Sequence, residues 1–123
     1  MWIEYNCNPK HRRIDDCTVR ALSKATGKSW RECHDILADQ SRDMGLMMDD
    51  KAVWGKVLKD MGFVKVIIPE WEPDDYTLRD FCKKHNKGNF IVATNNHVVA
   101  VDNGDYYDTF DSGDENPVFY WRN

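Results

Sequence analysis

The sequence predicts an α+β fold, with N-terminal helices packed on a C-terminal antiparallel β-sheet. Apolar residues recur with the period of a helix up to about residue 85, and from Gly88 onward they follow the period of two that is typical of strands. Helices that precede a run of strands, rather than alternating with them, indicate the α+β class. The 123 residues and their 41% hydrophobic content suit one core, and no repeat or linker divides the chain, so a single domain over residues 1–123 is expected.

Capping residues place four helices in the first part of the chain. Ser29 and Glu32 have the spacing of a capping box, and aspartates or a threonine precede the other three apolar stretches. Gly27 and Gly62 follow the first and the third stretch, as expected where helices end. The expected helices cover residues 16–26, 30–41, 50–61 and 77–85, with an exposed loop at residues 42–48.

Short runs of β-branched and aromatic residues predict the strands. Residues 94–96 and 102–105 are rich in turn formers, so the last strands are expected to form an antiparallel meander. The opening stretch, residues 6–13, is charged and rich in asparagine and proline, which predicts an extended loop. The expected strands cover residues 63–68, 90–93, 98–101, 106–110 and 118–121, with an acidic turn at residues 70–75.

The composition argues against several classes of partner. The net charge is −4 with both signs interspersed, and without a basic stripe a nucleic-acid partner is not expected. No apolar run approaches the ~18 residues of a membrane span, and no signal peptide is visible, so a cytoplasmic protein is expected. In that reducing compartment the four cysteines are expected to be free thiols rather than structural disulfides.

Cys17 is the candidate nucleophile. A reactive cysteine works as a thiolate, and the unsatisfied N–H groups and dipole at a helix N-terminus favour that charge. Among the cysteines only Cys17 falls in a predicted first helical turn, at the edge of the apolar stripe of its helix. Cys33 and Cys82 lie on apolar helix faces and are expected to pack in the core, and ordinary packing is also the alternative for Cys17.

His97 and Asp108 are the candidate base and its orienting group. His97 lies where the turn at Asn95 and Asn96 meets an apolar strand, although a turn histidine bonded to local backbone is an equal alternative. Asp108 lies on the following strand after two tyrosines, where a buried carboxylate needs a partner such as an imidazole. Asp102 or Asn103 would take this role if the strand pairing were shifted.

These residues occur in segments that resemble small papain-like cysteine peptidases of bacteria and phages. The segment DCTVRAL (residues 16–22) with GKSW (residues 27–30) resembles their nucleophile helix, and more loosely that of ovarian-tumour-type deubiquitinases. The segment from residue 88 to residue 108, which contains His97, resembles their histidine and carboxylate strands. The resemblance spans nearly the whole chain and implies a papain-like fold with the order Cys, His, Asp.

The resemblance implies a thiol hydrolase that acts on a peptide or protein substrate. Cys17 would attack an acyl carbon, His97 would pass its proton to the leaving group, and Asp108 would hold His97. Papain-like enzymes usually place a glutamine shortly before the cysteine to complete the oxyanion hole, and none precedes Cys17 here. Asn6 or Asn8 could donate instead, alongside the backbone N–H of Cys17. Two alternatives therefore stay open: an inactive papain-like binding module, and an acyltransferase or deamidase that uses the same triad.

No cofactor or metal is expected. A zinc site from Cys7, His11, Cys17, Cys33 and His34 lacks the paired spacing that such sites use. The acidic residues 111–116 are too short a segment for an EF-hand loop. The apolar residues 45–48 fall in a predicted loop and could line a substrate groove, although packing against the next helix is favoured.

Overall fold

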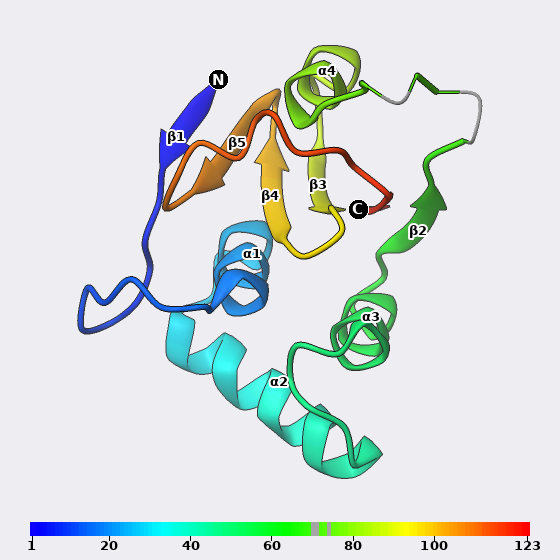
Figure 1. Cartoon of the computed structure of the whole chain (residues 1–123). Coiled ribbons are helices and arrows are strands. Elements are labelled where there is room, and N and C mark those ends of the chain that lie inside the picture. The colour runs from blue at the N-terminus through cyan, green and yellow to red at the C-terminus, as the bar shows by residue number, and fades with distance from the viewer. Residues whose placement is uncertain (70–71, 74) are drawn as a thin grey trace.

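The structure, a computed structural model, describes residues 1–69, 72–73 and 75–123. Within these residues it contains four helices and a mixed six-stranded sheet, so the predicted α+β class is confirmed (Figure 1). The helices are α1 (Cys17–Thr26), α2 (Trp30–Met44), α3 (Lys51–Asp60) and α4 (Leu78–Lys84). The strands are β1 (Trp2–Glu4), β2 (Val64–Ile67), β3 (Asn89–Ala93), β4 (Val98–Asp102), β5 (Asp105–Asp108) and β6 (Phe119–Arg122).

The predicted side-chain caps are present at α2, α3 and α4, whereas the aspartate before α1 makes no capping hydrogen bond. Ser29 Oγ accepts the Glu32 N–H at 3.1 Å and Glu32 Oε1 accepts the Ser29 N–H at 3.2 Å, which completes the capping box of α2. Gly27 ends α1 in the left-handed conformation, at φ 74°. The predicted loop from residue 42 is wrong at its start, because α2 continues to Met44 and ends at Gly45. The last turns of α2 are mostly polar, and the apolar pattern gives no signal there.

The sheet departs from the predicted antiparallel meander at two places. The strand order is β1-β5-β4-β3-β6-β2, so β3, β4 and β5 do form a meander but β6 pairs with β3 and β2 instead of continuing it. At one edge β1 pairs with β5 in parallel, which the sequence analysis missed. Three residues are too few to display a strand period. The acidic turn predicted at residues 70–75 includes residues 70, 71 and 74, which lie outside the described residues.

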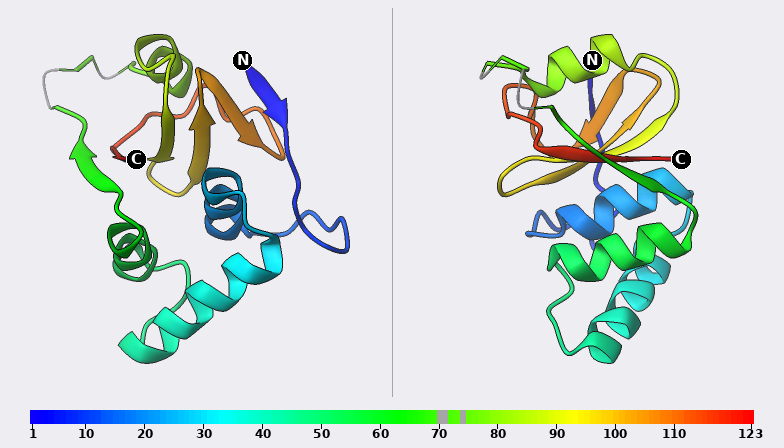
Figure 2. Two further views of the ribbon diagram at one scale, coloured as in Figure 1. Left: turned by 180° about the vertical axis from the view of Figure 1, so that it is seen from behind. Right: turned by 90° about the vertical axis from the view of Figure 1, so that its right-hand side faces the viewer.

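Helices cover both faces of the sheet. Figure 2 shows α1 and α3 on one face, with α2 packed outside them, and α4 on the opposite face. Each face has its own apolar cluster: Ile91 and Ala100 belong to a cluster with residues of α1, α2 and α3, whereas Val92 and Val99 belong to one with residues of α4. The continuous apolar runs of β3 and β4 follow from this burial on both faces. In the part of the chain that the structure describes, no helix is long and apolar enough to cross a membrane.

This topology brings three distant parts of the chain to one edge of the sheet. The N-terminus of α1 packs beside the beginning of β4, and β4 is antiparallel to β5. Because neighbouring antiparallel strands run in opposite directions, the residue before β4 and the last residue of β5 lie close together. His97, Asp108 and Cys17 occupy these three positions.

Candidate active site

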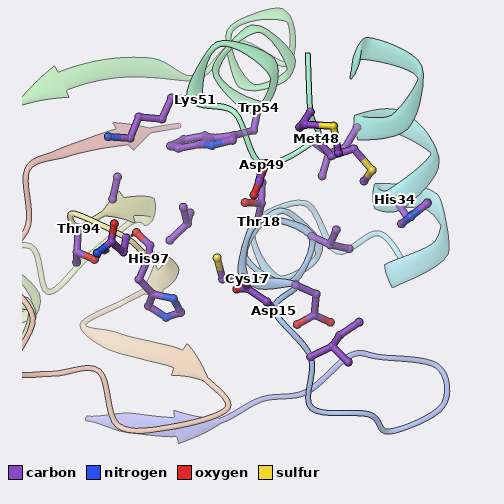
Figure 3. Close-up of a pocket in the computed structure, with 18 of the residues that line it drawn as sticks. Asp15, Cys17, Thr18, His34, Met48, Asp49, Lys51, Trp54, Thr94 and His97 are labelled. Atoms are coloured by element: carbon purple, nitrogen blue, oxygen red, sulfur yellow. Dashed lines mark hydrogen bonds between the residues drawn. The ribbon is translucent and has the colours of Figure 1, made fainter. Parts of the chain in front are cut away.

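Cys17 is the first residue of α1 and lies half-buried at the wall of a cavity (Figure 3). The residue before it, Asp16, is the N-cap, but its side chain makes no capping hydrogen bond to the backbone of α1. The N–H groups of a first helical turn have no acceptor within the helix. The sulfur of Cys17 therefore lies beside an uncapped helix N-terminus, which favours a negative charge there.

His97 lies beside Cys17 and also lines the cavity (Figure 3). It lies directly before β4, and its carbonyl oxygen accepts the Thr94 N–H at 2.9 Å, so the turn holds its backbone. Its side chain is 10% exposed and packs against the ring of Phe110 at 5.0 Å between centroids. Nε2 of His97 lies 2.5 Å from Oδ2 of Asp108, which leaves Nδ1 for the thiol of Cys17.

Asp108 is fully buried, and each of its carboxylate oxygens has two hydrogen-bond donors. Oδ2 accepts from His97 and from the Ser112 hydroxyl at 2.7 Å. Oδ1 accepts from the Arg20 guanidinium at 2.9 Å and from the Thr109 N–H at 2.8 Å. Four donors to one carboxylate fix its plane, so the imidazole that it contacts is oriented as well.

The three groups shift one another's protonation. Burial alone would raise the pKa of the Cys17 thiol, but the hydrogen bond and positive charge of His97 lower it below its ordinary value. Burial would lower the pKa of His97, yet the hydrogen bonds with Asp108 and Cys17 outweigh burial and raise it to about 9. Burial would raise the pKa of Asp108, but the contact with His97 keeps it below its usual range. All three shifts favour a thiolate, an imidazolium and a carboxylate.

A second group of buried charges connects the two ends of the site. Arg20 is 3% exposed and donates from Nη1 to Asp16 at 2.5 Å and from Nη2 to Asp108. The other oxygen of Asp16 accepts the Trp30 indole N–H at 2.9 Å. Arg20 and Ser112 were not predicted as partners of the site. An i,i+4 spacing between Asp16 and Arg20 was the one signal available, and it is common on exposed helices.

The cavity beside Cys17 has a volume of about 550 Å³ and lies between α1, the α2–α3 loop and the turn before β4. Trp54 and Leu37 are buried and form its apolar floor. Met47 is 75% exposed and Met48 half-buried, and both line the cavity, while Met48 also packs against the core. Met48 therefore packs against the core, as favoured from the sequence, and both Met47 and Met48 line the cavity.

The predicted oxyanion donors lie elsewhere. Asn6 donates from Nδ2 to the Arg12 carbonyl at 3.2 Å, and the side-chain oxygen of Asn8 accepts two backbone N–H groups of its own loop. Neither asparagine lines the cavity. The prediction is wrong because asparagines in a charged, proline-containing loop are used to close local turns. The fallback for the orienting group also fails, since Asp102 pairs with Lys24 at 3.7 Å rather than with His97.

All four cysteines, Cys7, Cys17, Cys33 and Cys82, are free thiols in the structure. Cys33 and Cys82 are buried, and burial raises the pKa of both, that of Cys82 to about 11. Only Cys17, among the described cysteines, combines a lowered pKa with a place in the cavity. No group of three or more potential metal-ligating side chains is found within the described ranges.

Comparisons with protein-family models, with curated proteins and with solved structures found no match to the chain. The function of the site therefore has to be inferred from its geometry and chemistry.

Proposed function

We propose that the chain is a cysteine peptidase or peptidase-like thiol hydrolase of the papain-like type, which cleaves an amide or isopeptide bond. The observation that carries this proposal is the contact series from Cys17, at the N-terminus of α1, to His97 and on to Asp108, whose carboxylate lies 2.5 Å from the imidazole. A nucleophile at the start of a helix, a histidine and a carboxylate on adjacent strands, and the order Cys, His, Asp all support a papain-like fold.

In the proposed reaction the Cys17 thiolate attacks the carbonyl carbon of the scissile bond and forms a C–S bond. The His97 imidazolium then gives its proton to the leaving nitrogen, the C–N bond breaks, and a thioester remains. Neutral His97 next takes a proton from water, whose oxygen attacks the thioester, and the C–S bond breaks to return the thiolate. Asp108 keeps the imidazole oriented throughout and stabilises its charged form.

The oxyanion of each tetrahedral intermediate would be bound by backbone N–H groups at the start of α1. The Cys17 N–H belongs to the uncapped first turn, and Cys17, Thr18 and Val19 of this turn line the cavity. Donors of this kind act on a charge that develops in the transition state and need no rearrangement. The proposal keeps the backbone donor expected from the sequence, the Cys17 N–H, and omits the side-chain donors Asn6 and Asn8, which do not line the cavity.

The proposal extends to a peptide or protein substrate met in the cytoplasm, without a nucleic acid, a membrane or a cofactor. The cavity has both apolar and charged walls: Trp54 and Met48 provide apolar surface, and Asp15, Asp49 and Lys51 lie at its edges. Such a mixed groove suits an extended chain whose backbone and side chains need different contacts.

A non-catalytic binding module is the second candidate. One observation favours it, namely that no asparagine or glutamine side chain of the predicted entry loop reaches the cavity to complete an oxyanion hole. Acyl transfer and deamidation remain enzymatic variants, because both pass through the same thioester and differ in the group that resolves it or in the amide attacked.

The pH dependence of iodoacetamide labelling tests the proposal, with each modified cysteine located by mass spectrometry. We expect Cys17 to label selectively at a pH well below the ~8.5 of an ordinary thiol. In His97→Ala the apparent pKa of Cys17 should rise by at least about one unit, which lowers the labelling rate at pH 6 about tenfold. His34→Ala removes another histidine of the same cavity and serves as the matched control.

Slow labelling of Cys17 at an ordinary thiol pKa, unaffected by His97→Ala, would contradict the proposal and favour the binding module. If the activated thiol is found, a screen of peptide and isopeptide substrates decides the reaction, and Cys17→Ala should abolish all turnover while the circular dichroism spectrum stays unchanged. Full turnover by folded Cys17→Ala would exclude the thioester mechanism.

A further inference from the structure

We propose that Arg20 is a positioning residue of this site. Through Nη2 it holds Asp108 against His97, and through Nη1 it keeps the Asp16 carboxylate away from the N-terminal amides of α1. The inference rests on the proposed function, because it assigns Arg20 to the activation of the same thiol. Arg20 does not line the cavity, so its action would pass through Asp16 and Asp108.

Burial makes this arrangement unusual. The side chains of Arg20, Asp16 and Asp108 are 4%, 5% and 0% exposed, so three charges have been removed from water together. The desolvation cost of buried ion pairs is large, and apolar residues of similar volume are often equally stabilising or better. Stability alone therefore gives no reason for an arginine at a position that is flanked by Val19 and Ala21 on the buried side of α1.

The contact between Arg20 and Asp108 helps to fix the orientation of the Asp108 carboxylate. Its Nη2 donates to Oδ1 of Asp108 at 2.9 Å, on the oxygen that does not bind His97. Without this contact, Oδ1 would keep only the backbone N–H of Thr109 as a donor. The carboxylate could then rotate and lengthen its bond to His97, and the imidazolium that stabilises the thiolate would lose its counter-charge.

The contact between Arg20 and Asp16 explains why the N-terminus of α1 lacks a side-chain cap. An aspartate at the N-cap ordinarily accepts a hydrogen bond from the second or third backbone N–H of its helix. Here Oδ1 of Asp16 accepts from Arg20 at 2.5 Å and Oδ2 accepts from the Trp30 indole, so no side-chain capping bond forms. A released carboxylate would occupy the amides that an oxyanion needs. Its uncompensated charge, next to Cys17, would also raise the pKa of the thiol.

Other charged groups around the cavity remain in place when Arg20 is changed. Arg20 and Asp16 lie on α1, Asp108 on β5, and His97 before β4. The remaining titratable groups that line the cavity are Asp15, His34, Asp49 and Lys51. The effect of Arg20 on the pH profile of Cys17 is therefore measured as a difference between variants of the same chain.

The test is the pH profile of Cys17 labelling by iodoacetamide in Arg20→Met, which removes the charge and keeps the length of the side chain. We expect the apparent pKa of Cys17 to rise by about one unit and the labelling rate at pH 6 to fall about tenfold. In Arg20→Lys, one charge remains without the fixed two-pronged donor geometry, so a smaller fall of about threefold is expected. Arg42→Met, which breaks the exposed pair with Asp39, is the control.

The double variant Arg20→Met with Asp16→Asn separates positioning from packing. It removes the carboxylate that Arg20 neutralises, so Cys17 should label faster at pH 6 than in Arg20→Met alone. If Arg20 only filled space, the Asp16→Asn change would not restore the labelling rate of Cys17. That result would overturn the role proposed for the contact between Arg20 and Asp16.

A folded Arg20→Met with the wild-type pH profile overturns the inference and leaves the proposed function intact. If Arg20→Met does not fold, Arg20→Lys decides, and a wild-type profile in that folded variant also overturns the inference. Wild-type Cys17 that labels as an ordinary thiol, independently of His97, overturns the proposed function and this inference with it.

Discussion

Folding raises the pKa of His97 and lowers the pKa of Cys17, so both groups make the stability of the chain depend on pH. The folded pKa of His97 is raised to about 9, above the ~6.5 of an unfolded chain, so at neutral pH the folded state binds a proton that the unfolded state lacks. The folded pKa of Cys17 is lowered, so as the pH rises the folded state releases the thiol proton before the unfolded state does. Between about pH 7 and 8 the two effects oppose each other.

Because the two effects oppose each other, removing the thiol should reveal the pH dependence of stability that His97 causes. In Cys17→Ala the contact with Asp108 still raises the pKa of His97, so the stabilisation is complete below about pH 6.5 and decreases as the pH rises toward the folded value. The free energy of unfolding should therefore fall by up to about 1.4 kcal/mol per pH unit between about pH 7 and 8. The wild-type chain should show a flatter profile. Urea unfolding at a series of pH values measures both.

A variant that lacks both groups, Cys17→Ala with His97→Gln, is the control and should lose the slope. Differences between variants cancel the contributions of groups common to all, such as Cys82, whose burial raises its pKa to about 11. Equal slopes in the wild type and in Cys17→Ala would show that the thiol is not ionised in the folded state at neutral pH.

At the scale of elements, the sequence predicted best what is determined locally. Ser29, Thr77 and Gly27 act within one or two turns of their own helices, so their spacing was sufficient to place helix ends. The end of α2 was missed because its last residues carry no apolar pattern, and β1 was missed because it is three residues long. Strand β1 also depends on its pairing with β5, which lies about a hundred residues along the chain.

The capping box of α2 gives a prediction about an element that supports the site. Ser29→Ala removes the side-chain acceptor of the Glu32 N–H at 3.1 Å and should lower the free energy of unfolding by about 1 kcal/mol. Ser29→Thr keeps the hydroxyl and should cost much less. Urea unfolding compares the three proteins, and equal stability of Ser29→Ala and Ser29→Thr would contradict a stabilising cap.

At the scale of the molecule, the three candidate site residues could be proposed because each carries its own local signal. Cys17 begins a predicted helix, His97 precedes an apolar strand, and Asp108 follows two tyrosines on the next strand. The contact of Arg20 with Asp108 joins residues 88 positions apart, and no local pattern reports it. Asn6 and Asn8 were expected at the cavity and do not line it, for the same reason: only the fold decides which side chains reach the cavity.

The whole sheet also supports the site through its edge strand. The Asp108 carbonyl accepts the Trp2 indole N–H at 3.1 Å and the Tyr5 N–H at 2.9 Å, and β1 pairs with β5 over the residues that end at Asp108. The position of Asp108 at the end of β5 therefore depends on the pairing of β5 with β1. The edge strand should thus affect the reactivity of Cys17, with which it has no hydrogen bond in the structure.

Deletion of residues 1–4 should therefore lower the labelling rate of Cys17 at pH 6 by about threefold to tenfold, because Asp108 loses part of its support and His97 becomes a weaker partner of the thiolate. Trp2→Phe removes the indole hydrogen bond alone and should have a smaller effect. Leu58→Ala, a core truncation in α3 that costs about 2–5 kcal/mol, is the control for lost stability. If it slows labelling as much as the deletion does, then general destabilisation explains the effect, and the edge strand has no specific role in holding Asp108.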